Sequence, residues 1–175
     1  IKRNVENDIA DKLQVAALQN SSKDKSENVM VVDLVRNDLS KICEQGSVQV
    51  SELFGIYSYP QVHQMISTIT GTLTSNTLFS EILEATFPMG SMTGAPKKCV
   101  METIDALEPT KRGLYSGTVG YFNPAGDFDF NVVIRSIFYN QVTKRLSIAV
   151  GSAITYLCDP AKEYSECLLK AEGLL

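Results

Sequence analysis

Two pairs of acidic residues recur at a spacing that places both carboxylates of a pair on one face of a helix. Asp24 precedes Glu27 by three positions, and Glu163 precedes Glu166 by the same spacing. Like charges one turn apart repel slightly, so each pair is either a solvated helix face or part of a cluster that a cation neutralises. Ligands that are all carboxylate oxygens suit Mg²⁺, which keeps waters and a substrate oxygen in its shell. Lys170, one turn beyond Glu166, either offsets the repulsion or meets a substrate anion.

Two further side chains are able to do acid–base or anion chemistry. His63 is the single histidine of the chain and lies in a strand-like run. It is either a hydrogen-bonded structural residue or a general acid, base or donor. Arg135 lies inside the apolar run 132–137, so the sequence predicts a buried guanidinium that needs an anion. That anion is either a protein carboxylate, in a structural salt bridge, or a substrate carboxylate, which arginine binds through two parallel hydrogen bonds.

Two loops offer backbone N–H groups. Residues 90–97, with the hydroxyls of Ser91 and Thr93, precede a predicted helix start, which is typical of an anion site at a helix N-terminus. The glycine spacing is not that of a Walker loop, and a plain loop-to-helix junction is the alternative. The second loop, which contains Gly151, Ser152 and Ala153, either presents N–H groups to an anion at a strand end or marks a bulge.

Composition excludes several classes of protein. The 175 residues are 44% hydrophobic and 21% charged, as is ordinary for a globular chain. A net charge of −4 and a pI near 5.0 leave no general basic surface, so we expect no nucleic-acid partner. No apolar run reaches membrane-spanning length, so we expect no membrane partner. Four scattered cysteines without a CxxC pair indicate reduced thiols in a cytoplasmic protein rather than disulfides or zinc.

Helices and antiparallel strands must position these residues. Helical spacing of apolar residues predicts a first helix that ends near residue 20 and a second that begins at Ser21 or Ser22 and stops at Gly46. Two further helices are predicted over 78–85 and 95–107. A last helix is predicted to begin after Asp159, with Pro160 in its first turn. Runs rich in Val, Ile, Thr and Tyr predict strands over 47–57, 62–73, 115–122, 128–139 and 146–156. The sum predicts an α+β fold with mostly antiparallel sheets packed with helices.

Read together, the motifs resemble the chorismate-utilising enzymes, which include the component I proteins of anthranilate synthase and aminodeoxychorismate synthase and the isochorismate and salicylate synthases. The matching segments occur in the family's order over nearly the whole chain. They are residues 27–39, 62–68, 90–97, 108–109, 112–121, 134–136 and 159–166. Within the family, residues 128–136 and 150–155 favour the aminodeoxychorismate synthase branch, which serves para-aminobenzoate and folate synthesis.

The resemblance implies a metal site and a substrate pocket. Mg²⁺ would be bound by Glu27 and Glu166, with Asp24 and Glu163 in or beside its shell, and would hold the ring carboxylate of chorismate while its allylic hydroxyl departs. The residues implied to contact the substrate are Tyr115 and Arg135 at the enolpyruvyl carboxylate, the backbone of Gly151, Ser152 and Ala153 beside them, Ser91 and Thr93 in the pocket wall, and His63 as the active-site histidine. Lys97 is expected on the surface at a helix start.

The implied reaction replaces the C4 hydroxyl of chorismate with an amino group, using ammonia from a glutamine amidotransferase subunit or domain. The alternatives are anthranilate synthase component I, which aminates C2, and a non-catalytic chorismate-binding module. Ala153 and the pair Leu157-Cys158 depart from the family pattern, and the family's upstream lysine motif is absent from the sequence. We therefore expect residues 1–175 to be the C-terminal portion of a single catalytic domain, inactive by themselves.

Overall fold

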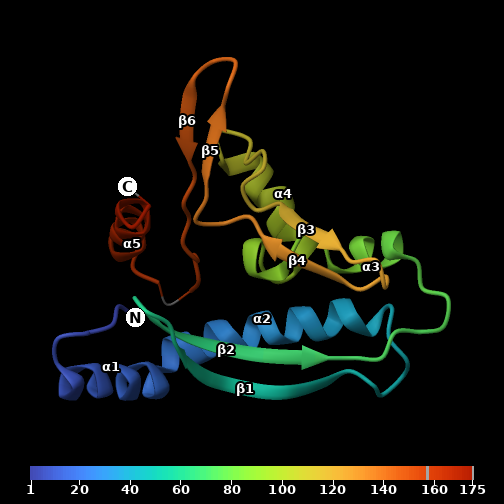
Figure 1. The fold of residues 1–175 in the computed structure, drawn as a ribbon, viewed down its shortest axis with the longest axis horizontal. Coiled ribbons are helices and arrows are strands. Elements are labelled where there is room, and N and C mark those ends of the chain that lie inside the picture. The colour runs from blue at the N-terminus through green and yellow to red at the C-terminus, as the bar shows by residue number, and fades with distance from the viewer. Residues whose placement is uncertain (157, 175) are drawn as a thin grey trace. The chain divides into compact units, whose positions relative to one another are not determined.

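The computed structural model describes residues 1–156 and 158–174, which form two compact units, Ile1–Ile104 and Asp105–Leu175. The first unit contains α1 (Asp8–Asn20), α2 (Ser22–Ser40), β1 (Gln49–Ser58), β2 (His63–Thr70), α3 (Phe79–Thr86), the 3₁₀ turn η1 (Gly90–Met92) and the start of α4 (Lys97–Leu107). The second contains β3 (Thr118–Phe122), β4 (Phe128–Val132), β5 (Ile137–Asn140), β6 (Arg145–Ile148) and α5 (Pro160–Glu172). The predicted α+β class with antiparallel strand pairs is confirmed (Figure 1). That the whole is a portion of one catalytic domain stays a prediction.

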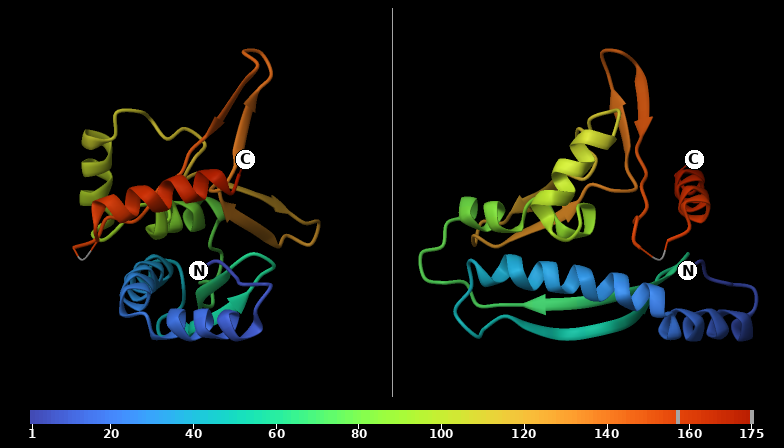
Figure 2. Two further views of the ribbon diagram at one scale, coloured as in Figure 1. Left: turned by 90° about the vertical axis from the view of Figure 1, so that its left-hand side faces the viewer. Right: turned by 180° about the vertical axis from the view of Figure 1, so that it is seen from behind.

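In the first unit, β1 and β2 form an antiparallel pair that packs along α2 (Figure 2). The hydroxyl of Ser21 accepts the N–H of Asp24 at 3.2 Å and begins α2, as the sequence predicts. The predicted stop at Gly46 is wrong, because α2 already ends at Ser40. The chain leaves the helix there because the carbonyl of Ile42 accepts the N–H of Thr74 at 3.0 Å, so the segment joins the chain after β2 instead.

The core of the first unit lies between the end of α2, the segment that follows it, and α3. Its buried members are Ile42, Cys43 and Ala85, with Leu39, Val48 and Ile82 partly buried around them. Burial raises the pKa of the Cys43 thiol, so this cysteine is a protonated core residue at neutral pH.

In the second unit, each of the two hairpins is a separate antiparallel pair, β3 with β4 and β5 with β6. Three aromatic rings from the first hairpin, Phe122, Phe128 and Phe130, lie with centroids 5.5–5.9 Å apart in tilted or edge-on geometry. The carboxylate of Asp159 accepts the N–H groups of Ala161 and Lys162 at the start of α5, which confirms the predicted cap with Pro160 in the first turn.

The predicted strand over 128–139 is wrong, because it is divided into β4 and β5 by residues 133–136. Within this break Arg135 has a φ of 48°, a left-handed conformation that does not continue a regular strand. Arg135 is therefore outside both strands and exposed, not buried as the apolar run predicts. The other two strands are shorter than predicted: β6 ends at Ile148, and Tyr115 lies in a turn before β3.

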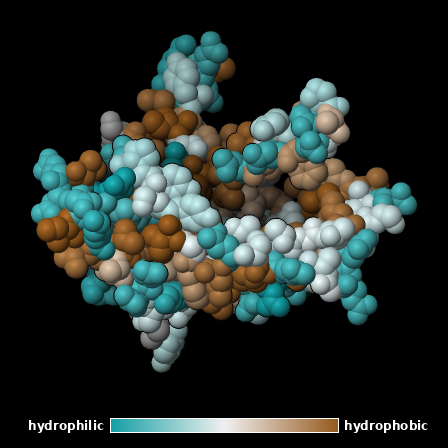
Figure 3. All heavy atoms as spheres, turned by 60° about the horizontal axis from the view of Figure 1, so that its bottom comes forward, coloured by the Kyte–Doolittle hydropathy of each residue, from teal (hydrophilic) through white to brown (hydrophobic). Residues whose placement is uncertain are grey.

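The apolar residues of α1 whose spacing predicts a helix are largely exposed. Ile9 and Leu13 are 74% and 66% exposed, whereas Asp11 and Leu18 are the buried residues of this helix. Figure 3 shows hydrophobic residues in brown between hydrophilic residues in teal on the face turned to the viewer. Along the described residues, no helix combines the length and apolar character that crossing a bilayer requires.

Candidate active site

Three residues of the predicted substrate pocket meet in the second unit. Lys170, in the last turn of α5, donates from its ammonium to the carbonyl of Gly151 at 3.0 Å. Gly151 also lies against Tyr115, because a Cβ placed at position 151 would stand 2.7 Å from the tyrosine Oη. The loop after β6 is thus fixed between a helix and the turn before β3, although these segments are far apart in the sequence.

Two carboxylates of α5 lie next to this loop. Glu163 is 4% exposed and accepts a hydrogen bond from the hydroxyl of Ser152. Glu166, one turn later and facing solvent, pairs with Lys170 at 2.7 Å. Lys170 therefore offsets the charge of Glu166 and positions Gly151 at the same time. Together these contacts place predicted metal ligands and predicted substrate-binding residues beside each other in one unit.

Tyr115 is suited to donate a hydrogen bond. Burial raises the pKa of its phenol, so the group stays protonated at neutral pH. The turn that carries it is held by Arg112, which pairs with Glu108 and reaches the Ser116 hydroxyl at 3.4 Å. Glu108 and Arg112 lie in the motif segments but were not singled out as positioning residues; their i, i+4 spacing was the available signal.

Arg135 and Ala153 are both exposed in the second unit. Ala153 is not among the described non-glycine residues with positive φ, so its backbone carries no left-handed strain. Of the departure Leu157-Cys158, Leu157 lies outside the described residues.

In the first unit, Asp24 and Glu27 lie one turn apart on α2, both half-buried. The carboxylate of Glu27 is 3.8 Å from the ammonium of Lys23. This pair therefore lies on one helix face, as the spacing predicts.

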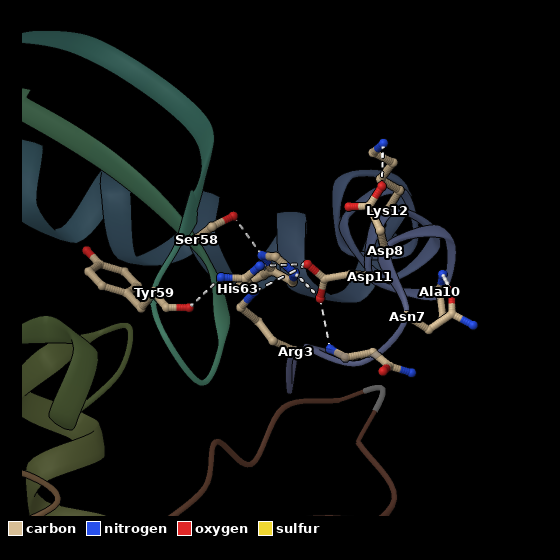
Figure 4. Close-up of polar contacts among 10 residues, drawn as sticks. Arg3, Asn7, Asp8, Ala10, Asp11, Lys12, Ser58, Tyr59 and His63 are labelled. Atoms are coloured by element: carbon tan, nitrogen blue, oxygen red, sulfur yellow. Dashed lines mark hydrogen bonds and ion pairs between the residues drawn. The ribbon is translucent and has the colours of Figure 1, made fainter.

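His63, at the start of β2, is enclosed at 2% exposure and uses both ring nitrogens (Figure 4). Its Nε2 lies 3.0 Å from Oδ1 of Asp11 on α1, and its Nδ1 lies 2.8 Å from Oγ of Ser58 at the end of β1. Asp11 is held in turn by Arg3 through two contacts of 3.0 and 3.2 Å. Asp11 was not predicted as a site residue, because His63 lies 52 residues away from it in the chain.

The carboxyl of Asp11 is ionised at every physiological pH. Hydrogen bonds from Arg3, followed in weight by those from His63 and the N–H of Asn4, lower its pKa to about 2 against the opposing effect of burial. The imidazole of His63 therefore faces a full negative charge. Its assignment as a catalytic residue stays a prediction.

Loop residues 90–97 pack on α2. Gly90 is buried so closely that a Cβ there would stand 2.8 Å from Cβ of Leu34. Thr93 uses its hydroxyl on the carbonyl of Met89 at 3.1 Å, and Ser91 is exposed. Lys97 is not a surface residue as expected, because its side chain is 19% exposed and its ammonium contacts Asp38 at 2.5 Å.

The predicted Mg²⁺ ligands fit that ion in kind. All four are carboxylates, two on α2 and two on α5, and a hard cation prefers such oxygen ligands. Within the part of the chain that the structure describes, no group of three or more His, Cys, Asp or Glu side chains is gathered around a potential metal position. Each unit by itself therefore contains one pair of carboxylates, and their role as metal ligands stays a prediction.

Comparison with known proteins identifies the class. The model of the chorismate binding enzyme family matches residues 3–175, and the chain belongs to this family. It is 50% identical over 156 residues to a probable chloroplastic aminodeoxychorismate synthase of Oryza sativa subsp. japonica, covering 89% of this chain and 17% of that protein. It is 41% identical over 165 residues to aminodeoxychorismate synthase component 1 of Klebsiella aerogenes, covering 94% and 36%.

A solved structure agrees with this assignment. Anthranilate synthase component I of Streptococcus pneumoniae superimposes with a TM-score of 0.86 at 34% identity, over 95% of this chain and 38% of that one. The chain thus spans well under half the length of the relatives and the structure to which it is similar.

Proposed function

We propose that the protein containing these residues aminates chorismate at C4 to give 4-amino-4-deoxychorismate. The observation that carries the proposal is the cluster of the second unit, in which Tyr115, Gly151 and Lys170 lie together beside the buried Glu163. The identity of 50% to an aminodeoxychorismate synthase, against 43% to an anthranilate synthase component 1, supports amination at C4 over C2.

In this proposal the chain binds the two carboxylates of chorismate at different places. The protonated phenol of Tyr115 donates to the enolpyruvyl carboxylate, together with the N–H groups of residues 151–153. The exposed guanidinium of Arg135 binds the same carboxylate through paired hydrogen bonds. Ser91 and Thr93 line the pocket, and His63 holds or moves a proton.

The four carboxylates of Asp24, Glu27, Glu163 and Glu166 would hold Mg²⁺. When bound, the ion would supply Lewis-acid chemistry to the ring carboxylate and the hydroxyl of the substrate. Ammonia would come from a glutamine amidotransferase, as the name component 1 of the Klebsiella relative suggests for a two-component enzyme. A cytoplasmic location belongs to the same proposal.

The test is the product formed by the whole protein that contains these residues, given chorismate, an ammonium salt and Mg²⁺. Mass spectrometry is expected to show an aminated product that keeps its enolpyruvyl group. Release of anthranilate and pyruvate would instead support the C2 reaction. Chorismate binding without either product would support a non-catalytic module.

Gly151→Ala tests the pocket separately. The new methyl group displaces the Tyr115 hydroxyl from the proposed carboxylate. A hydrogen bond to a charged group contributes about 1.5–3 kcal/mol, so we expect chorismate affinity to fall at least about tenfold in a titration. Gly173→Ala is the matched control, because its nearest neighbours are 3.7 Å from the new methyl group. Equal affinities in the two variants would place the substrate away from Gly151.

A further inference from the structure

In the hydrogen bond between Asp11 and His63, only the histidine is able to be the donor. An ionised carboxylate only accepts hydrogen bonds, and Asp11 accepts them on both oxygens (Figure 4). Oδ2 receives Nε and Nη2 of Arg3, and Oδ1 receives the N–H of Asn4 at 2.8 Å. Nε2 of His63, 3.0 Å from Oδ1, must therefore carry a proton, since a lone pair there would face a negative oxygen.

The proton on Nε2 also determines the state of the second ring nitrogen, Nδ1. In the neutral imidazole only one nitrogen is protonated, so Nδ1 presents a lone pair to Ser58. The Ser58 hydroxyl then donates to Nδ1 across 2.8 Å. Because His63 is 2% exposed while Ser58 is exposed, the serine hydroxyl is the outer end of this chain of hydrogen bonds.

We infer that Asp11 is a positioning residue for His63: held by Arg3, it fixes the imidazole as the Nε2-protonated tautomer with its Nδ1 lone pair directed at Ser58. The low pKa of Asp11 is consistent with this role, because the carboxylate stays charged throughout the range in which a histidine titrates. Ser58, with its proton donated inward, presents oxygen lone pairs to the outside. A proton that His63 exchanges with a bound molecule passes through this hydroxyl.

His63 is the single histidine of these 175 residues. Long-range ¹H–¹⁵N correlation spectra of the whole protein, recorded where the ring is neutral, report on its ring through the signals that His63→Gln removes. We expect a protonated Nε2 and an unprotonated Nδ1. A ring protonated at Nδ1 would overturn the inference without any variant.

Variants separate Asp11 from its neighbours. Asp11→Asn is expected to give averaged ¹⁵N shifts, because an amide presents either a donor or an acceptor to Nε2. Ser58→Ala is expected to keep the Nε2-protonated form, since the carboxylate remains. Asp8→Asn, on the same helix but with a side chain 79% exposed and paired only with Lys12 in the structure described, is the control and should leave the spectrum unchanged. An unaltered tautomer in Asp11→Asn, or its loss in Ser58→Ala, would contradict the inference.

The catalytic consequence rests on the proposed function and has its own readout. In the whole protein, Asp11→Asn is expected to lower kcat for chorismate amination roughly tenfold, as loss of a partner that orients a functional histidine does, while KM changes less than about twofold. Asp8→Asn should change neither. Averaged shifts with an unchanged kcat would support the positioning of His63 by Asp11 and remove His63 from the proposed mechanism.

Discussion

Lys97→Met is expected to lower the free energy of unfolding by about 3 kcal/mol, the low end of what removing one partner of a buried ion pair costs. Asp38 on α2 is 4% exposed, and its carboxylate lies between the ammonium groups of Lys97 and Lys41 at 2.5 and 3.1 Å. Lys97 is the enclosed partner of the two. Without Lys97, the buried carboxylate of Asp38 is left with the ammonium of Lys41, whose charge solvent screens.

Lys41→Met is the matched control, because the same substitution removes the other partner of the same carboxylate. The Lys41 side chain is 53% exposed, and pairs of that kind contribute about 0–1 kcal/mol. Urea denaturation of the three proteins measures the difference. Equal losses in the two variants would mean that burial of Lys97 does not matter, and the ion pair would then not be what holds loop 90–97 on α2.

Glu27→Gln and Glu166→Gln are each expected to abolish the part of chorismate binding that depends on Mg²⁺. An amide of the same shape removes the negative charge that a hard cation requires. Titrations of chorismate with and without Mg²⁺ should coincide for each variant, whereas those of the unmodified whole protein should differ. Glu166→Gln also releases Lys170 from its pair at 2.7 Å, so binding without Mg²⁺ should not fall.

Glu172→Gln provides the control for α5. This residue is exposed at the last position of the same helix, and we expect both titrations to match those of the unmodified protein. If Mg²⁺ still changed chorismate binding in Glu27→Gln or Glu166→Gln, the substituted residue would be part of a solvated helix face and not a metal ligand.

The sequence predicted those features that depend on near neighbours. Ser21 and Asp159 begin helices through hydrogen bonds to groups two or three residues away, and both were predicted. The stop of α2 was not, because the carbonyl of Ile42 takes its donor from Thr74, a partner 32 residues away. Local composition carries no information about such a partner.

In the candidate site, too, features that depend on near neighbours were predicted and those that depend on distant partners were not. The acidic pairs follow from helical spacing, and the neighbourhood of Tyr115 and Gly151 follows the family resemblance. Asp11 was missed because a polar residue in an amphipathic helix is ordinarily expected in solvent. Its burial is explained by Arg3, the N–H of Asn4 and His63, all of which reach it from outside the helix.

Arg135, in the break between β4 and β5, has a backbone conformation that is costly for a residue with a side chain. A left-handed conformation costs an L-residue with a side chain roughly 1–2 kcal/mol, a penalty that glycine avoids. Stability alone would therefore favour glycine at position 135, where φ is 48°. The chain instead has an arginine there, exposed and outside both strands. In the proposed function this guanidinium binds the substrate, so substitutions at position 135 that relieve the backbone would stabilise the fold and lower activity.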